Sequence, residues 1–323
     1  MTEPGSIHFH PQRKGGLRPN DPFKPRLLLR STGAVRQVPQ HPLEANLFGD
    51  VELGMDLNDR AGTCVPTGFD NWRRMATSLL AGSATAASEA DIVRWYRTQN
   101  PGFDPAGTAD TDGPGSDSDQ GMVIQDFLAW LTRERLILGF AAISVGDDEM
   151  LKAAAWLGMG PINGLTLTDA QVGQQFDAGT WDEVGGQPVG GHCVPTGAYT
   201  AADRAEEDCA TWRTRVHMTA SFLDRRRDEA WAVLLPEHVQ HPGFREGFDL
   251  AAFAQAFEGI TGRPFPVHVP PPAPGPGAAT FPVVLGAADA ARVVELATRA
   301  HVTGPEWIAH IVTNHLHHHR STP

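Results

Sequence analysis

The chain has 323 residues, of which 41% are hydrophobic and 20% charged, a balance typical of a globular protein and not of a disordered one. Its net charge of −12 argues against a general nucleic-acid binder, because phosphate binding calls for a basic surface. The three cysteines allow at most one intramolecular disulfide, which is the usage of a reducing compartment. With no secretory signal or membrane-length apolar run, we expect a cytoplasmic protein, or a virion component if a bacteriophage encodes the chain.

Residues 1–50 are rich in proline, glycine and arginine and show little hydrophobic periodicity, which predicts an extended arm. Residues 1–40 hold seven basic side chains against two acidic ones. The arm is expected to be a solvated irregular segment, and the alternatives are that it docks on an acidic partner or on the acidic body of its own chain.

Three helices are predicted next, and the first begins at Cys64, where Pro66 is tolerated in the first turn. The second covers residues 88–99 with Ser88 as its N-cap, and the third covers residues 121–134. Residues 101–120 between them form a loop rich in glycine, aspartate and proline.

The centre of the chain alternates strand-like and helix-like segments. Strands are expected at residues 136–145 and 162–167, around His192, and at residues 209–212 and 229–235, with a helix-like stretch between the last two. Residues 147–157 and 248–257 are expected to be short helices.

The C-terminal part reads as an appendage. Residues 264–286 are so rich in proline that they predict a stiff linker unable to join a sheet. Residues 287–323 predict a helical hairpin followed by a histidine-rich tail, which binds transition metals at most adventitiously.

Two residues are candidates for nucleophilic chemistry. Cys64 opens a helix, whose N-terminal dipole favours a thiolate, and His192 follows paired glycines in a strand-like run. A thiol needs a neighbouring base to become a nucleophile at neutral pH, and histidine is that base most often. The alternative is structural: a small buried cysteine and a hydrogen-bonded core histidine.

Four segments in order resemble a papain-like cysteine peptidase domain, in particular an uncharacterised branch from bacteria and bacteriophages. They are residues 58–64 (Asn-Asp…Gly-Thr-Cys), 160–162 (Gly-Pro-Ile), 190–194 (Gly-Gly-His-Cys-Val) and 228–234 (Asp-Glu-Ala-Trp-Ala-Val-Leu). The resemblance implies an α+β fold in the papain manner over residues 51–263, with a helical half carrying Cys64 and an antiparallel sheet half carrying His192. The arm would precede this domain and the hairpin would follow it.

The resemblance also implies roles. Cys64 would be the nucleophile, His192 its base and then acid, and Asn58 an oxyanion donor in place of the family's glutamine. The family's histidine-orienting asparagine is replaced here by Ala210. Asp208, two residues earlier on the same face of a regular strand, is the substitute that the sequence offers. The remaining cysteines, Cys193 and Cys209, are expected to pack, with Cys193 facing away from His192.

The function implied is a thiol hydrolase that cleaves a peptide or amide bond through a Cys-His dyad. The alternative is a catalytically weakened papain-fold structural or binding protein, such as a virion component. We expect a peptide or protein substrate and protein assembly through the arm and hairpin, without a membrane or sequence-specific nucleic acid. No cofactor or metal is expected, because the sequence has no glycine-rich phosphate loop and no zinc-ligand cluster of proper spacing. A calcium site is not expected either, because the aspartates of residues 110–119 lack the glutamate of an EF-hand and Pro114 interrupts them.

Overall fold

The computed structural model describes residues 15–36, 44–200 and 206–267. The chain divides into two compact units, Met1–Pro271 and Pro272–Pro323. All described residues belong to the first unit. The predicted hairpin and histidine-rich tail, and most of the proline-rich linker, lie outside the described residues.

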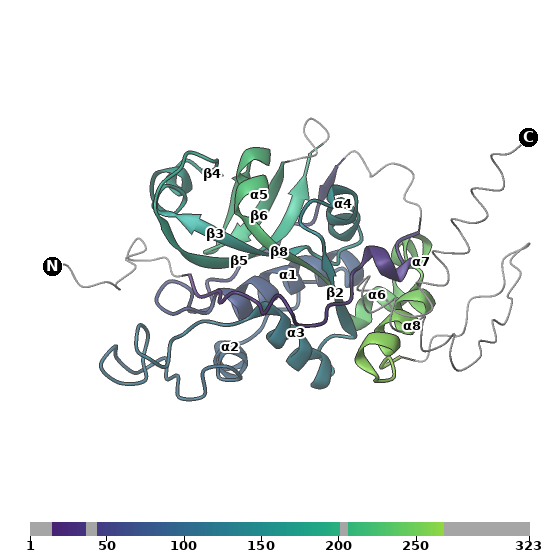
Figure 1. The fold of residues 1–323 in the computed structure, drawn as a ribbon, viewed down its shortest axis with the longest axis horizontal. Coiled ribbons are helices and arrows are strands. Elements are labelled where there is room, and N and C mark those ends of the chain that lie inside the picture. Colours follow the sequence, from purple (N-terminus) through teal and green to yellow (C-terminus); the bar gives the residue numbers. More distant parts are fainter. Residues whose placement is uncertain (1–14, 37–43, 201–205, 268–323) are drawn as a thin grey trace, which may run out of the picture. The chain divides into compact units, whose positions relative to one another are not determined.

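The described residues form an α+β structure around one large sheet (Figure 1). The strand order is β2 (Gly139–Ile143), β8 (Arg227–Leu234), β3 (Ile162–Thr168), β5 (Pro188–Tyr199), β6 (Glu207–Thr211), β7 (Thr214–Met218) and β4 (Thr180–Trp181). The short β1 (Ala45–Asn46) also pairs with β5. Neighbours are antiparallel except β4 and β7, which are parallel.

Three helices make the helical half: α1 (Cys64–Ala81), α2 (Glu89–Tyr96) and α3 (Ile124–Arg133). Each puts an apolar face into one core cluster, which the sheet completes with Cys193, Ile162 and Trp231. Ser88 caps α2 in a reciprocal capping box with Asp91, as its sequence position predicts. Hydrophobic periodicity and capping thus predicted the three helices of the helical half, with helix ends shifted by a few residues at most positions.

The other helices are α4 (Asp148–Trp156), α5 (Ala220–Arg226), α6 (Pro236–Gln240), α7 (Pro242–Gly247) and α8 (Leu250–Thr261), with helical turns η1 (Arg30–Thr32) and η2 (Gln171–Gln175). The stretch after residue 212 corrects a prediction, since it begins with strand β7 and turns helical only in α5. Trp212 and Arg213 adopt positive φ angles of 41° and 63°, which fold β6 directly back into β7. Neither tryptophan nor arginine is a residue type that predicts such a turn from sequence.

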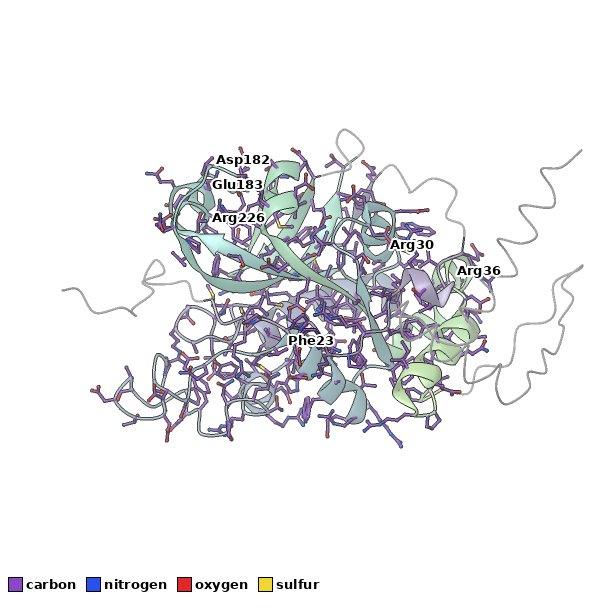
Figure 2. The ribbon with its side chains drawn as sticks, in the orientation of Figure 1. Phe23, Arg30, Arg36, Asp182, Glu183 and Arg226 are labelled. Atoms are coloured by element: carbon purple, nitrogen blue, oxygen red, sulfur yellow. The ribbon has the colours of Figure 1, made fainter. Side chains whose placement is uncertain are left out.

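The described part of the arm, residues 15–36, is docked on the body of its own chain and is not a solvated tail. Leu29 is 1% exposed and lies in a core cluster with α4 and α8. Arg30, labelled in Figure 2, forms two hydrogen bonds of 2.5 Å with Asp147, the N-cap of α4, and a third with Glu149. The expected solvated arm is therefore wrong for these residues, which dock on acidic side chains of their own chain, the alternative that the sequence left open.

Candidate active site

Cys64 is the first residue of α1 and its side chain is fully buried. Its sulfur accepts hydrogen bonds from the backbone N–H groups of Cys193 on β5 and of Gly16 on the arm. Burial is the largest influence on the thiol and raises its pKa to about 12, although these hydrogen bonds oppose the rise. Cys64 is therefore a neutral thiol at neutral pH in this arrangement.

His192 lies on β5 and is also buried, with its ring held on two sides. Its Nε2 is 2.7 Å from Oγ1 of Thr211, and its ring stacks on Trp212 with centroids 4.2 Å apart. Burial lowers the pKa of His192 to about 3, so the ring is neutral at neutral pH. Its Nδ1 is buried and makes no hydrogen bond within the described residues.

The two candidate catalytic residues lie at neighbouring points of one strand–helix contact. The N–H group that binds the Cys64 sulfur belongs to Cys193, the residue directly after His192. The Cys193 side chain packs in the cluster of α1, whereas the His192 ring packs on Trp212, so Cys193 faces away from His192 as predicted. No hydrogen bond joins Cys64 to His192 in the described structure.

The side chain hydrogen-bonded to the His192 ring is that of Thr211, which the sequence reasoning missed. Asp208 instead binds Arg215 and, at 2.8 Å, Nδ1 of His217 on β7. A register shift in the β5–β6 pairing, between Thr196 and Ala198, sets which β6 residue reaches His192. The family motif pointed to Ala210, one residue too early. One signal in the sequence could have pointed to Thr211 as the partner of His192: it is the polar residue immediately before Trp212.

Asn58 lies in the loop that leads into α1 and is 1% exposed. Its Nδ2 donates to the carbonyl oxygen of Ala61 at 3.2 Å, which ties the side chain to the loop beneath Cys64. The described structure thus places Asn58 in the Cys64 loop, and a role as oxyanion donor stays a prediction.

The arm crosses directly over Cys64. The N–H groups of Gly16 and Leu17 both donate to the Gly191 carbonyl at 3.1 Å. On the other side, the Met122 N–H donates to the Gly16 carbonyl at 2.7 Å, and the Arg18 N–H donates to the Met122 carbonyl at 2.8 Å. Leu17 thereby bridges the loop before α3 and the strand of His192, and the arm closes access to the thiol.

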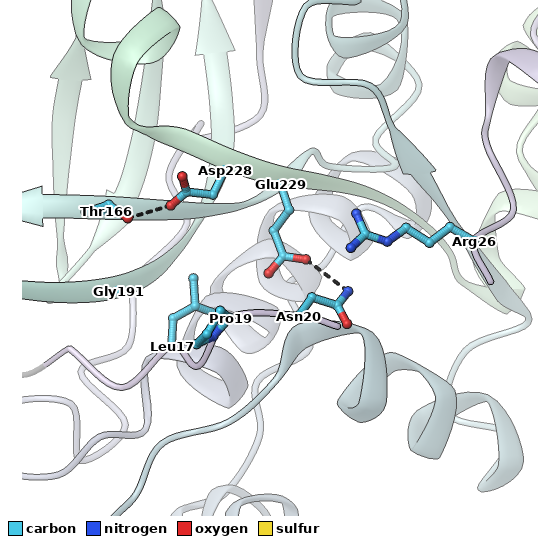
Figure 3. A pocket seen from close by; sticks show the side chains of 8 residues that line it. All are labelled: Leu17, Pro19, Asn20, Arg26, Thr166, Gly191, Asp228 and Glu229. Atoms are coloured by element: carbon cyan, nitrogen blue, oxygen red, sulfur yellow. Dashed lines mark hydrogen bonds between the residues drawn. The ribbon is translucent and has the colours of Figure 1, made fainter. Parts of the chain in front are cut away.

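A cavity of about 420 Å³ opens beside Leu17 (Figure 3). The arm supplies one wall, and β3, β5 and β8 supply the other. Its charged groups are Arg26 on the arm and Asp228 and Glu229 on β8. Burial raises the pKa of Glu229, while Trp231 Nε1 donates to its carboxylate at 2.8 Å. The cavity is thus polar, with acidic groups on the sheet side.

In the part of the chain that the structure describes, no three histidine, cysteine or acidic side chains cluster as metal ligands. The acidic loop uses Asp119 to bind its own surroundings: Asp119 accepts from the Tyr96 hydroxyl at 2.6 Å and from the Gly62 N–H at 2.8 Å. Among the same described residues, no helix has both the length and the apolar character to cross a membrane.

Comparison with known proteins gives little beyond these observations. No family model matches the chain, and no curated protein sequence matches it. Among solved structures, the chain is similar to xylellain, a cysteine protease from Xylella fastidiosa, with 12% identity over 69% of this chain and 97% of that one. The TM-score is 0.46, so the case for a papain-like domain depends on the residues of this chain.

Proposed function

We propose that the chain is a papain-like thiol hydrolase of peptide or amide bonds, and that the arm over Cys64 holds it in a latent form. The observation that carries the proposal is the buried Nδ1 of His192, which makes no hydrogen bond to any residue that the structure describes and belongs to a ring fixed by Thr211. A buried polar atom without a partner is costly, and such atoms concentrate where function requires them. This one lies one residue from the N–H that binds the Cys64 sulfur.

The proposed reaction uses these groups in order. With Nε2–H donating to Thr211, Nδ1 carries the lone pair that takes the Cys64 proton as the sulfur attacks the substrate carbonyl. The same proton passes from Nδ1 to the departing amine, leaving a thioester on Cys64. Water then gives a proton to Nδ1 and attacks the thioester, which releases the acid and restores the thiol. Asn58 and the Cys64 N–H are the proposed donors to the oxyanion.

A latent form accounts for the pKa values of the Cys64 thiol and the His192 imidazole. A thiol with a pKa of about 12 and an imidazole with a pKa of about 3 do not form an ion pair, and both values result from burial. The arm contributes to that burial, because Gly16 is in contact with the Cys64 sulfur. Displacing the arm admits water and substrate, which lowers the thiol pKa and raises the histidine pKa.

The test opens the arm in the full-length chain with Leu17→Glu, which puts a carboxylate against Asp228 and Glu229 in the cavity (Figure 3). We expect Cys64 in this variant to react with iodoacetamide at pH values well below about 8.5, the pKa of an ordinary cysteine thiol. We also expect release of fluorescent peptides from labelled casein. Adding His192→Ala should abolish both the alkylation of Cys64 at low pH and the release of peptides from casein. Adding Cys64→Ala should also abolish the release of peptides.

The contrary outcome is a Cys64 that becomes accessible in Leu17→Glu yet reacts with an ordinary thiol pH profile, unchanged by His192→Ala. That result would favour the second candidate, a catalytically silent binding module of the same fold. The observation in its favour is the hydrogen-bond partner of the His192 ring, which is the Thr211 hydroxyl and not the asparagine amide that papain-like enzymes place there. Fold by itself does not decide between the two.

A further inference from the structure

We propose that the cleft over Cys64 is a glycine-selective slot, which binds extended peptides carrying a glycine followed by a leucine-sized apolar residue. The inference deepens the proposed function, because it names the class of peptide that the same site takes. In the described structure the slot is filled in cis by Gly16 and Leu17 of the arm.

The slot is too narrow for any side chain at the position of Gly16. A Cβ atom on Gly16 would overlap the carbonyl of Gly62, in the loop before Cys64. On the opposite side, a Cβ on Gly121 would overlap the Gly16 carbonyl. The φ angle of Gly16 is not in the left-handed region, so space, and not backbone conformation, demands glycine here.

The next position has the opposite character. The Leu17 side chain lies over two bare glycines of the sheet, Gly191 on β5 and Gly164 on β3. A Cβ on Gly191 would lie 3.0 Å from the Leu17 Cβ, and one on Gly164 would lie 2.9 Å from a Leu17 methyl carbon. Leu17 also packs against the core cluster of α1. The site thus selects a small residue and then an apolar one.

The polar contacts of Gly16 and Leu17 in the slot involve their backbone alone, whereas the side chain of the next residue, Arg18, donates to Oε1 of Gln99 at 2.6 Å. The Gly191 carbonyl and the Met122 N–H and carbonyl bind the peptide groups of residues 16–18, as strands bind in a sheet. Backbone bonds of this kind anchor any extended peptide, so the glycine walls and the Leu17 seat supply the selectivity. Beyond Leu17 the chain enters the acidic cavity of Figure 3, where Pro19 and Asn20 form part of the wall.

The experiment follows Cys64 alkylation by iodoacetamide in the full-length protein, read by mass spectrometry. In Gly16→Ala the new methyl group should lift the arm, and we expect the Cys64 rate to rise about tenfold or more. A peptide copying residues 14–19, Lys-Gly-Gly-Leu-Arg-Pro, should restore protection of Cys64 in trans. The same peptide with alanine for its second glycine should not protect.

Two further variants complete the test. Gly146→Ala is the control, because a Cβ there meets nothing within 4 Å, and it should keep the wild-type rate. Gly191→Ala narrows the slot from the sheet side; its Cβ would meet Leu17 alone among the nearest atoms. This variant should expose Cys64 and should gain no protection from either peptide.

An unchanged Cys64 rate in Gly16→Ala would overturn the proposal, and so would equal protection by the glycine and alanine peptides. Neither readout requires turnover or His192. The slot can therefore fail while the hydrolase proposal stands, and the hydrolase can fail while the slot stands.

Discussion

At the scale of single residues, the site depends on one hydrogen bond that the family pattern did not contain. Thr211 holds Nε2 of His192 at 2.7 Å, while Trp212 covers the ring face. A hydroxyl can both donate and accept, so it fixes the ring without imposing a charge. The position is fully enclosed, and a partner lost there leaves a buried nitrogen unsatisfied.

Thr211→Val removes the hydroxyl and keeps the shape of the side chain. We expect a loss of about 1–3 kcal/mol in the free energy of unfolding, the usual cost of an unsatisfied buried polar group. Urea denaturation measures it. Thr211→Ser, which retains the hydroxyl, is the control and should lose clearly less. Equal losses in both variants would mean that the methyl group, and not the hydrogen bond, matters here.

At the scale of elements, a second buried histidine joins three helices and makes stability depend on pH. His238 on α6 stacks on Trp72 of α1, with centroids 6.5 Å apart, and contacts Phe244 of α7 at 4.7 Å. Its Nδ1 accepts the Leu235 N–H at 2.9 Å, which starts the helix. Burial lowers its pKa to about 3. The unfolded chain therefore binds a proton at His238 before the folded one does.

The sign follows from that difference. The stabilisation is present above the unfolded pKa of about 6.5 and is lost as pH falls toward the folded value. For His238→Gln we expect the unfolding free energy to decline less on acidification, by up to ~1.4 kcal/mol per pH unit below 6.5. Urea titrations between about pH 8 and 5 measure the slope on both sides of 6.5.

His217→Gln is the control of opposite sign. Burial alone would lower the pKa of His217, but hydrogen bonds and charge from Asp208 and Glu206 raise it overall. Its stabilisation is fully present below the unfolded pKa of about 6.5 and is lost as pH rises above that value, so its removal should make the decline on acidification steeper only above about pH 6.5. If both variants change the slope in the same direction, burial does not govern His238.

At the scale of the whole molecule, the arm is a component of the fold as well as the cover of the site. Leu27, Leu29 and Ala34 lie in the cluster formed by β2, α4 and α8. The Leu29 N–H donates to the Ala142 carbonyl on β2 at 2.8 Å, and the Ala142 N–H donates to the Leu27 carbonyl at 2.7 Å. Removing the arm to open the site would therefore also open the core.

Leu29→Ala should cost about 2–5 kcal/mol of unfolding free energy, the range for truncating a buried leucine. Phe23→Ala is the matched control on the same arm, because Phe23 is 92% exposed (Figure 2) and should change stability by less than about 0.5 kcal/mol. Chemical denaturation followed by tryptophan fluorescence compares the two. A Leu29→Ala variant as stable as Phe23→Ala would show that the arm folds independently of the body.

Local sequence patterns determined the helices at Cys64 and Ser88, the strand of His192 and the orientation of Cys193 away from His192, because periodicity and capping act over a few residues. They also named the thiol and the imidazole. Tertiary structure decided the rest. The β5–β6 register selected Thr211 over Asp208, and the turn at Trp212 and Arg213 made a strand where a helix was predicted. Long-range packing placed Gly16 over Cys64, and burial, which no local pattern encodes, set both pKa values.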